Sequence, residues 1–203
     1  MDIYNLFLNS LVKPSIICDE IRFYKITRQN IIEGAVFVSC LGTIISFAMG
    51  HFIIDSSEQM QQLLNGNSIT FLFNPFATFL FELLFIVVLI FTILIFGNLS
   101  KNNRDIEEIG KVVVWICFVS ISFKIIQLFF IATLSNFYLI LRVLEMIWFV
   151  WALSTVVCII YDFKSLIMTA VTGLIVVSFV MIFFLIVILS IVQTLLGGGS
   201  INV

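Results

Sequence analysis

The feature that most constrains this chain is a series of apolar stretches, each long enough to cross a lipid bilayer as a helix. A transmembrane helix needs about 20 mostly apolar residues to span the hydrocarbon core. Five stretches meet that requirement, at about residues 34–54, 76–97, 111–134, 137–161 and 166–193. Because 62% of the residues are apolar and only 11% are charged, a soluble bundle would have no polar face left for water. The sequence therefore predicts an all-α integral membrane bundle of five transmembrane helices.

Basic residues near the ends of these stretches predict the orientation of the chain, since lysine and arginine favour the cytoplasmic side. They precede the first stretch, separate the second from the third, and separate the fourth from the fifth: Lys13, Arg22, Lys25, Arg28, Lys101, Arg104, Lys111 and Lys164. The connections at 55–69 and 135–136 contain no lysine or arginine. Five spans then place the N-terminus in the cytoplasm and the C-terminus outside.

Residues 1–30 are too polar to span a membrane, but they carry apolar residues at helical spacing. These are Leu6, Phe7, Leu11, Ile16, Ile17, Ile21 and Tyr24. Pro14 suits the first turn of a second short helix. We expect two amphipathic helices that lie on the cytoplasmic leaflet. The predicted division of the chain is therefore an interfacial segment at 1–30, a five-helix domain at 31–194 and a flexible exterior tail at 195–203.

The first stretch carries small residues along one face. Gly34, Gly42, Ser46 and Gly50 are spaced by four or eight residues, so they fall on a narrow stripe of a helix. Small residues let helices approach closely in lipid. The stripe predicts a packing seam against a neighbouring helix or a second copy of the chain. The alternative is the ordinary frequency of glycine in membrane helices.

Four charged residues lie within the predicted spans: Glu82, Lys124, Arg142 and Glu145. At a rise of 1.5 Å per residue, each lies roughly 8 to 15 Å from the outer end of its span. Two acids and two bases at similar depth sum to zero charge, which lowers the cost of burying them. We interpret the four as a structural ion-pair network. The alternative is a polar chamber, with Gln127, His51 and Thr133 nearby, that holds a small polar solute, an ion or a proton.

Several classes of function have no signal in this sequence. The net charge is -2 and there is no block of basic residues, so nucleic acid is not an expected partner. Glycine-rich phosphate loops and nucleophile motifs are absent, and His51 is the sole histidine. The widely spaced cysteines predict neither a disulfide nor a metal site: Cys18, Cys40, Cys117 and Cys158. We therefore expect a protein that is not an enzyme and needs no cofactor.

Two segments carry a further pattern. LVKPSIICDEI at 11–21 has a proline followed by an apolar and acidic stretch, and EGAVFVSCLGTIISFAMG at 33–50 is a glycine-rich first span. With the five-span layout, these segments resemble the Yip-one domain family of Ypt-interacting membrane proteins. Eukaryotic members carry an Asp-Leu-Tyr-Gly-Pro element that this sequence lacks. The absence of this element argues against GTPase binding and favours the short bacterial branch of the family. The low charge, the many isoleucines and phenylalanines and the two prolines also fit a bacterial inner-membrane protein.

The resemblance implies a non-enzymatic membrane organiser or adaptor that acts through its helices and its N-terminal segment. The embedded charges support an alternative, a small transporter or channel subunit. The expected partners are the lipid bilayer and other membrane proteins or a homo-oligomer. A hydrated path past Glu82 and Lys124 would favour transport, whereas closed ion pairs would favour the organiser.

Overall fold

The computed structural model describes residues 3–21, 24, 26–55, 74–99, 105–133, 135–179 and 182. Every element assigned among these residues is a helix, so the predicted all-α class is confirmed. Several predicted features lie outside the described residues. They are most of the loop between the first two spans, the part of the fifth stretch after Phe179, the tail at 195–203, and the basic residues Arg22, Lys25, Lys101 and Arg104.

Four long apolar helices form the body of the structure. They are α3 (Arg28–Asp55), α5 (Pro75–Leu99), α6 (Ile106–Thr133) and α7 (Ser135–Ile160). Each contains a window that is long and apolar enough to cross a membrane. The four helices coincide with the first four predicted spans to within six residues at each end.

The outward faces of these helices are apolar, and this decides which solvent surrounds them. Large side chains such as Ile44, Phe91 and Phe129 are more than half exposed. Soluble monomers rarely expose contiguous apolar surface on this scale. The chain is therefore a multi-pass membrane protein in which four helices can span the bilayer.

The fifth predicted span is described only in part, as the helix Leu166–Phe179. At a rise of 1.5 Å per residue that helix is about 21 Å long. The hydrocarbon core of a bilayer is about 30 Å thick. The described residues therefore contain four helices that are long and apolar enough to span the bilayer, and the fifth span stays a prediction.

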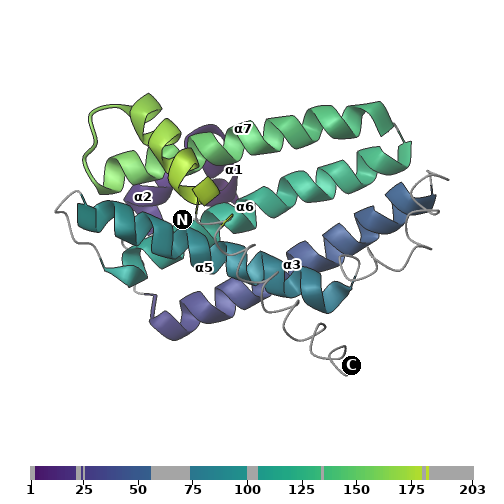
Figure 1. Ribbon diagram of the computed structural model, residues 1–203, viewed down its shortest axis with the longest axis horizontal. Coiled ribbons are helices and arrows are strands. Elements are labelled where there is room, and N and C mark those ends of the chain that lie inside the picture. Colours follow the sequence, from purple (N-terminus) through teal and green to yellow (C-terminus); the bar gives the residue numbers. More distant parts are fainter. Residues whose placement is uncertain are drawn as a thin grey trace, which may run out of the picture.

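The long helices share two common ends. Arg28 Nε donates to Glu107 Oε1 over 2.9 Å, so α3 and α6 begin together at what we call the Arg28 end. At the same end Tyr161, which directly follows α7, donates its hydroxyl to the carbonyl of Ile93 on the last part of α5. We call the opposite end, where α5 begins, the Pro75 end. Figure 1 shows the bundle with this axis close to horizontal.

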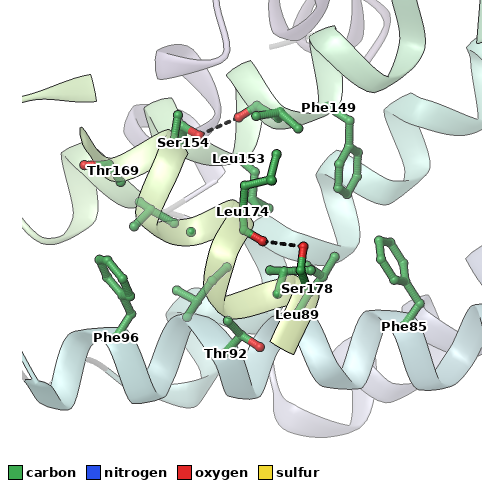
Figure 2. A pocket seen from close by; sticks show the side chains of 16 residues that line it. Phe85, Leu89, Thr92, Phe96, Phe149, Leu153, Ser154, Thr169, Leu174 and Ser178 are labelled. Atoms are coloured by element: carbon green, nitrogen blue, oxygen red, sulfur yellow. Dashed lines mark hydrogen bonds between the residues drawn. The ribbon is translucent and has the colours of Figure 1, made fainter. Parts of the chain in front are cut away.

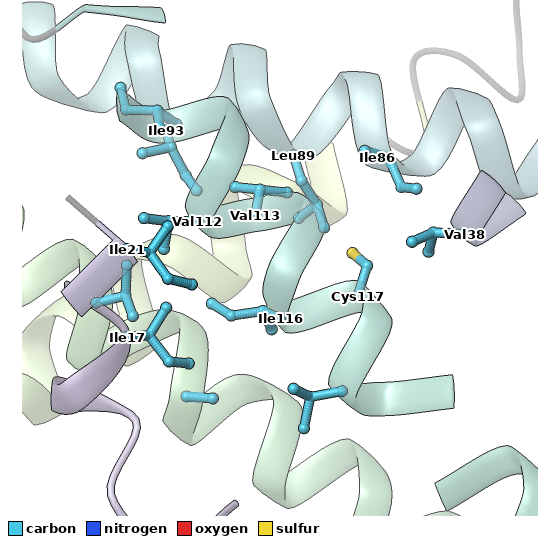
Figure 3. Close-up of a cluster of buried hydrophobic side chains, with 14 of the residues drawn as sticks. Ile17, Ile21, Val38, Ile86, Leu89, Ile93, Val112, Val113, Ile116 and Cys117 are labelled. Atoms are coloured by element: carbon cyan, nitrogen blue, oxygen red, sulfur yellow. The ribbon is translucent and has the colours of Figure 1, made fainter. Parts of the chain in front are cut away.

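The helix α6 lies at the centre of the bundle, where it contacts α3, α5 and α7. Its Ile109, Ile116 and Val119 side chains are fully buried. Figure 3 shows branched aliphatic side chains of α5, among them Leu89, beside those of α6. Glycine makes the α3–α6 contact close, since a Cβ added at Gly110 would lie 2.9 Å from the side chain of α3 that packs there.

The two predicted N-terminal helices are present as α1 (Ile3–Val12) and α2 (Ser15–Ile21). They pack on α6 and α7 at the half of the bundle nearer the Arg28 end (Figure 1). Their apolar residues face that bundle, because Leu6, Ile17 and Ile21 are almost completely buried.

Two tryptophans fix these short helices in place. Trp115 Nε1 of α6 donates to Ser10 Oγ over 3.0 Å, and Trp148 Nε1 of α7 donates to the carbonyl of Leu11 over 3.0 Å. Trp148 precedes the end of α7 by 12 residues, which corresponds to about 18 Å along the axis. The turn between α1 and α2 therefore reaches about halfway along α7.

Candidate functional site

All four of the charged residues predicted within the spans line one cavity of about 670 Å³ between α5, α6 and α7. Glu82 comes from α5, Lys124 from α6, and Arg142 and Glu145 from α7. Each lies seven to ten residues from the end of its helix at the Pro75 end, so the cavity sits roughly 10 to 15 Å in from that end. The structure thus brings together side chains that are as much as 63 residues apart in sequence.

One ion pair joins α5 to α6. The ammonium of Lys124 contacts Glu82 Oε1, and the side chains are 13% and 25% exposed respectively. Ser46 of α3 donates its hydroxyl to the same oxygen over 3.4 Å. A Cβ added at Gly42 would lie 3.2 Å from the Glu82 carboxyl carbon, so the absence of a side chain there makes room for the carboxylate. Three helices therefore meet at this carboxylate.

A second ion pair lies on α7. Arg142 Nη1 donates to Glu145 Oε2 over 2.8 Å, between residues one helical turn apart. Gln127 Nε2 of α6 donates to the same oxygen over 2.8 Å. Gln127 and Glu145 are buried, whereas the side chain of Arg142 is 40% exposed. The amide of Gln127 thus holds the Glu145 carboxylate in place, and the guanidinium of Arg142 is the most accessible charge of the site.

The four charges form two pairs and not one connected network, because no ion pair among the described residues joins Lys124 to Glu145 or Arg142 to Glu82. Both pairs line the same cavity. Charged groups inside a membrane domain are costly, so they normally face one another or a water-filled space. These four side chains do both. Such a space can hold a charged solute that exchanges partners with one of the pairs.

The wall of the cavity toward the Arg28 end is apolar. Phe85 of α5 and Phe149 of α7 face each other there, with ring centroids 5.9 Å apart. Past the two rings lies a second cavity of about 220 Å³, between α5, α7 and the helix Leu166–Phe179 (Figure 2). The charged groups are thus at the Pro75 side of the rings, and the apolar cavity is at the Arg28 side.

The small residues of the predicted seam lie in two places. Gly34 faces α6, where an added Cβ would lie 3.1 Å from Val114 Cγ1. Gly42 and Ser46 face Glu82 of α5. Gly50 is half-buried. The stripe therefore packs against two neighbouring helices, α6 and α5, and its middle part contacts Glu82 in the wall of the charged cavity.

Of the other sequence candidates, Cys117 also lines the charged cavity and His51 does not. His51 is exposed and makes an edge contact with Phe47, with ring centroids 4.6 Å apart. The side chain of Thr133 lies outside the described residues. None of the four cysteines forms a disulfide, and the described part of the chain holds no cluster of three potential metal ligands. Sequence reasoning did not find the Phe85–Phe149 pair, although its residues follow Glu82 and Glu145 by one helical turn.

Comparison with family models, with curated proteins and with solved structures finds no match for this chain. The resemblance to the Yip-one domain family therefore stays a prediction.

Proposed function

We propose that this chain is a non-enzymatic membrane protein that binds a small charged solute in the cavity between α5, α6 and α7, as a small transporter or channel subunit. The observation that carries the proposal is that all four embedded charges, contributed by three helices, line that one cavity. A purely structural network would gain most by closing on itself, because each buried charge then has its partners and no cavity is needed.

The size and the charges of the cavity fit this role. Its volume of about 670 Å³ falls within the roughly 300–1,000 Å³ of typical ligand pockets. The site is neutral overall, so a solute does not have to overcome a net field. Arg142 has one guanidinium nitrogen on Glu145, and no other described residue accepts from it. Its remaining donors supply a place for an anionic group of the solute.

An organiser or adaptor similar to the Yip-one domain family is a second candidate. The observation that favours it is that Lys124 contacts Glu82 and Arg142 contacts Glu145, so each charge already has a partner within the bundle. In that case the charges only fix the packing of α5, α6 and α7. Such a protein would act through its lipid-facing surface and through partners in the membrane or a second copy of the chain.

Flux measurements on the purified protein in liposomes separate these functions. The test solutes are small carboxylates, phosphate, amino acids and alkali cations. We expect one of these classes to enter faster than into protein-free liposomes. Replacing the first ion pair, as Glu82→Gln with Lys124→Met, removes that flux while keeping the site neutral. The matched control removes the surface pair, as Arg28→Gln with Glu107→Gln, and leaves the flux unchanged. Flux that matches protein-free liposomes for every class, from a protein shown to be folded, overturns the transport proposal.

The orientation that we propose places the Arg28 end in the cytoplasm of a bacterial inner membrane. Lys111, near the start of α6, supports it, because basic residues favour that side. Single cysteines at Asn74 and Asp105, in a chain without its four native cysteines, test it with a membrane-impermeant maleimide. Asn74→Cys should react in intact cells, and Asp105→Cys only after permeabilisation. Reaction of both from the same side contradicts the proposed orientation.

A further inference from the structure

The apolar cavity beyond the phenylalanine pair is lined almost entirely by hydrocarbon. Figure 2 shows Leu89 of α5, Leu153 of α7 and Leu174 of the helix Leu166–Phe179 around it. Four hydroxyls also line it, and three of them donate to the backbone of their own helix, those of Ser154, Thr169 and Ser178. The fourth, Thr92 Oγ1, is buried without a partner in the described part of the chain.

This cavity adjoins the charged one. Phe85, Phe149, Val150 and Leu174 line both. The two phenylalanine rings, tilted by 35° to each other, therefore lie in the wall that the two cavities share. A molecule that occupies both would therefore have a polar end beside the ion pairs and an apolar end toward the Arg28 end of the bundle.

We propose that the two adjoining cavities form one binding site for a single-chain amphiphile with an anionic head group. The head lies against Arg142 in the charged cavity, and the alkyl chain passes Phe85 and Phe149 into the apolar cavity. This inference rests on the proposed function and deepens it, because it names the chemical class of the solute. The shared chemistry is a carboxylate or phosphate on an alkyl chain, as in a fatty acid or an alkyl phosphate.

The head group follows from the donors that are available. The side chain of Arg142 is 40% exposed, and among the described residues only its Nη1 donates to a partner, Glu145. A planar guanidinium binds carboxylate and phosphate oxygens in pairs, which a single ammonium does not. Lys124 of α6 lines the same cavity and adds a second positive charge there.

The alkyl chain of the ligand is inferred from the volume and the apolar lining of the second cavity. A volume of about 220 Å³ accommodates on the order of seven methylene groups if each takes about the 30 Å³ of a liquid water. Thr92 lines this cavity and is 3% exposed, and its hydroxyl has no partner in the described part of the chain. A Cβ added at Gly173 would meet nothing within 4 Å, although Gly173 lines this cavity.

The experiment uses photoreactive probes with the full chain in nanodiscs of neutral lipid. The probes are tetradecanoic acid with a diazirine near its methyl end, the corresponding alkyl phosphate, and the methyl ester of the acid as the uncharged control. We expect the acid or the phosphate to label residues 89–96 of α5 and 153–157 of α7, at least tenfold more than the ester does. Labelling by only one of the two anions identifies which head group the site takes.

Two variants test the two cavities separately. Gly173→Leu places a side chain in the apolar cavity, where its Cβ meets nothing within 4 Å, and should lower labelling at least tenfold. Its matched control is Val171→Leu, an exposed position of the same helix, which should label like the parent. Arg142→Gln with Glu145→Gln keeps the site neutral and should make the acid and its ester label equally. Thermal unfolding of each variant verifies that it is folded.

Several outcomes overturn the proposal. Equal labelling by acid and ester in the parent contradicts binding of the anionic head group in the charged cavity. Undiminished labelling in Gly173→Leu contradicts binding of the alkyl chain in the apolar cavity. A photoreactive amino acid at position 89 that cross-links to residues 180–193 instead of to the probe shows that the protein's own residues fill the cavity, and this result also overturns the proposal. If chainless anions cross liposomes with the protein and no probe labels it, only the amphiphile fails. If flux and labelling are both absent, the proposed function fails as well.

Discussion

Removing the positive charge of Lys124 should destabilise the protein, and the structure sets the size of the effect. Its side chain is 13% exposed and its ammonium contacts Glu82, which is 25% exposed. Two unit charges about 4 Å apart attract by about 4 kcal/mol at an effective dielectric constant of 20. Breaking a buried pair costs about 3–5 kcal/mol. Because this pair borders a cavity, we expect the lower end, about 3 kcal/mol, for Lys124→Met.

The double variant identifies the partner. Lys124→Met with Glu82→Gln removes both charges and should recover about 2 kcal/mol, which is within the 0.5–3 kcal/mol found for residues in contact. Lys124→Met with Glu145→Gln should instead be additive, because Glu145 accepts from Arg142 and Gln127 and not from Lys124. The second cycle is thus a control at the same depth in the same cavity.

Thermal unfolding in nanodiscs, followed by tryptophan fluorescence, measures these effects. For a chain of about this length, 1 kcal/mol shifts Tm by about 2–4 °C, so Lys124→Met should lower Tm by roughly 6–12 °C. All variants are heated at one scan rate, since membrane proteins often unfold irreversibly. A shift below about 2 °C, or coupling to Glu145 instead of Glu82, would refute the pairing on which this reasoning depends.

Three further predictions concern packing. Gly42→Leu crowds the carboxylate in the cavity wall and should cost about 1–3 kcal/mol of unfolding free energy, whereas Val36→Leu, at an exposed position, should leave Tm unchanged; equal shifts would contradict a close contact at Gly42. Gly97→Ala places a Cβ 2.2 Å from a tyrosine ring and should lower Tm. Gly173→Ala meets open space and should raise the free energy of unfolding by about 0.5–1 kcal/mol through helix propensity. Trp148→Phe removes a donor to α1 and should cost about 1 kcal/mol; hydrogen exchange that stays equally slow in α1 and α2 would refute that role.

The long helices could be predicted because their signal is local. About 20 consecutive apolar residues identify a span whatever surrounds it, and the polar interruptions at Glu82 and Lys124 identified part of the site. Which of the embedded charged residues pair with one another could not be predicted. It depends on the rotation of each helix about its axis, and an apolar face all round leaves that rotation open.

The N-terminal segment shows the same limit. The spacing of Leu6, Ile17 and Ile21 predicted two amphipathic helices, and both are present. Their apolar faces meet α6 and α7, but the same pattern fits a lipid surface equally well. What distinguishes the two is the hydrogen bonds from Trp115 and Trp148 to this segment. Those donors lie more than 100 residues away, so no local pattern reports them.

The docking of α1 and α2 also sets the order in which the newly made protein matures. Ser10 meets Trp115 across 105 residues of sequence, and Leu11 meets Trp148 across 137. At a synthesis rate of about 5–20 residues per second, roughly 7 to 27 seconds separate the emergence of α1 from that of its most distant partner. Until α6 and α7 have been made, the apolar surface that later contacts them depends on a chaperone or on the bilayer surface. The segment that carries α1 and α2 is thus made early but is among the last to reach its final position.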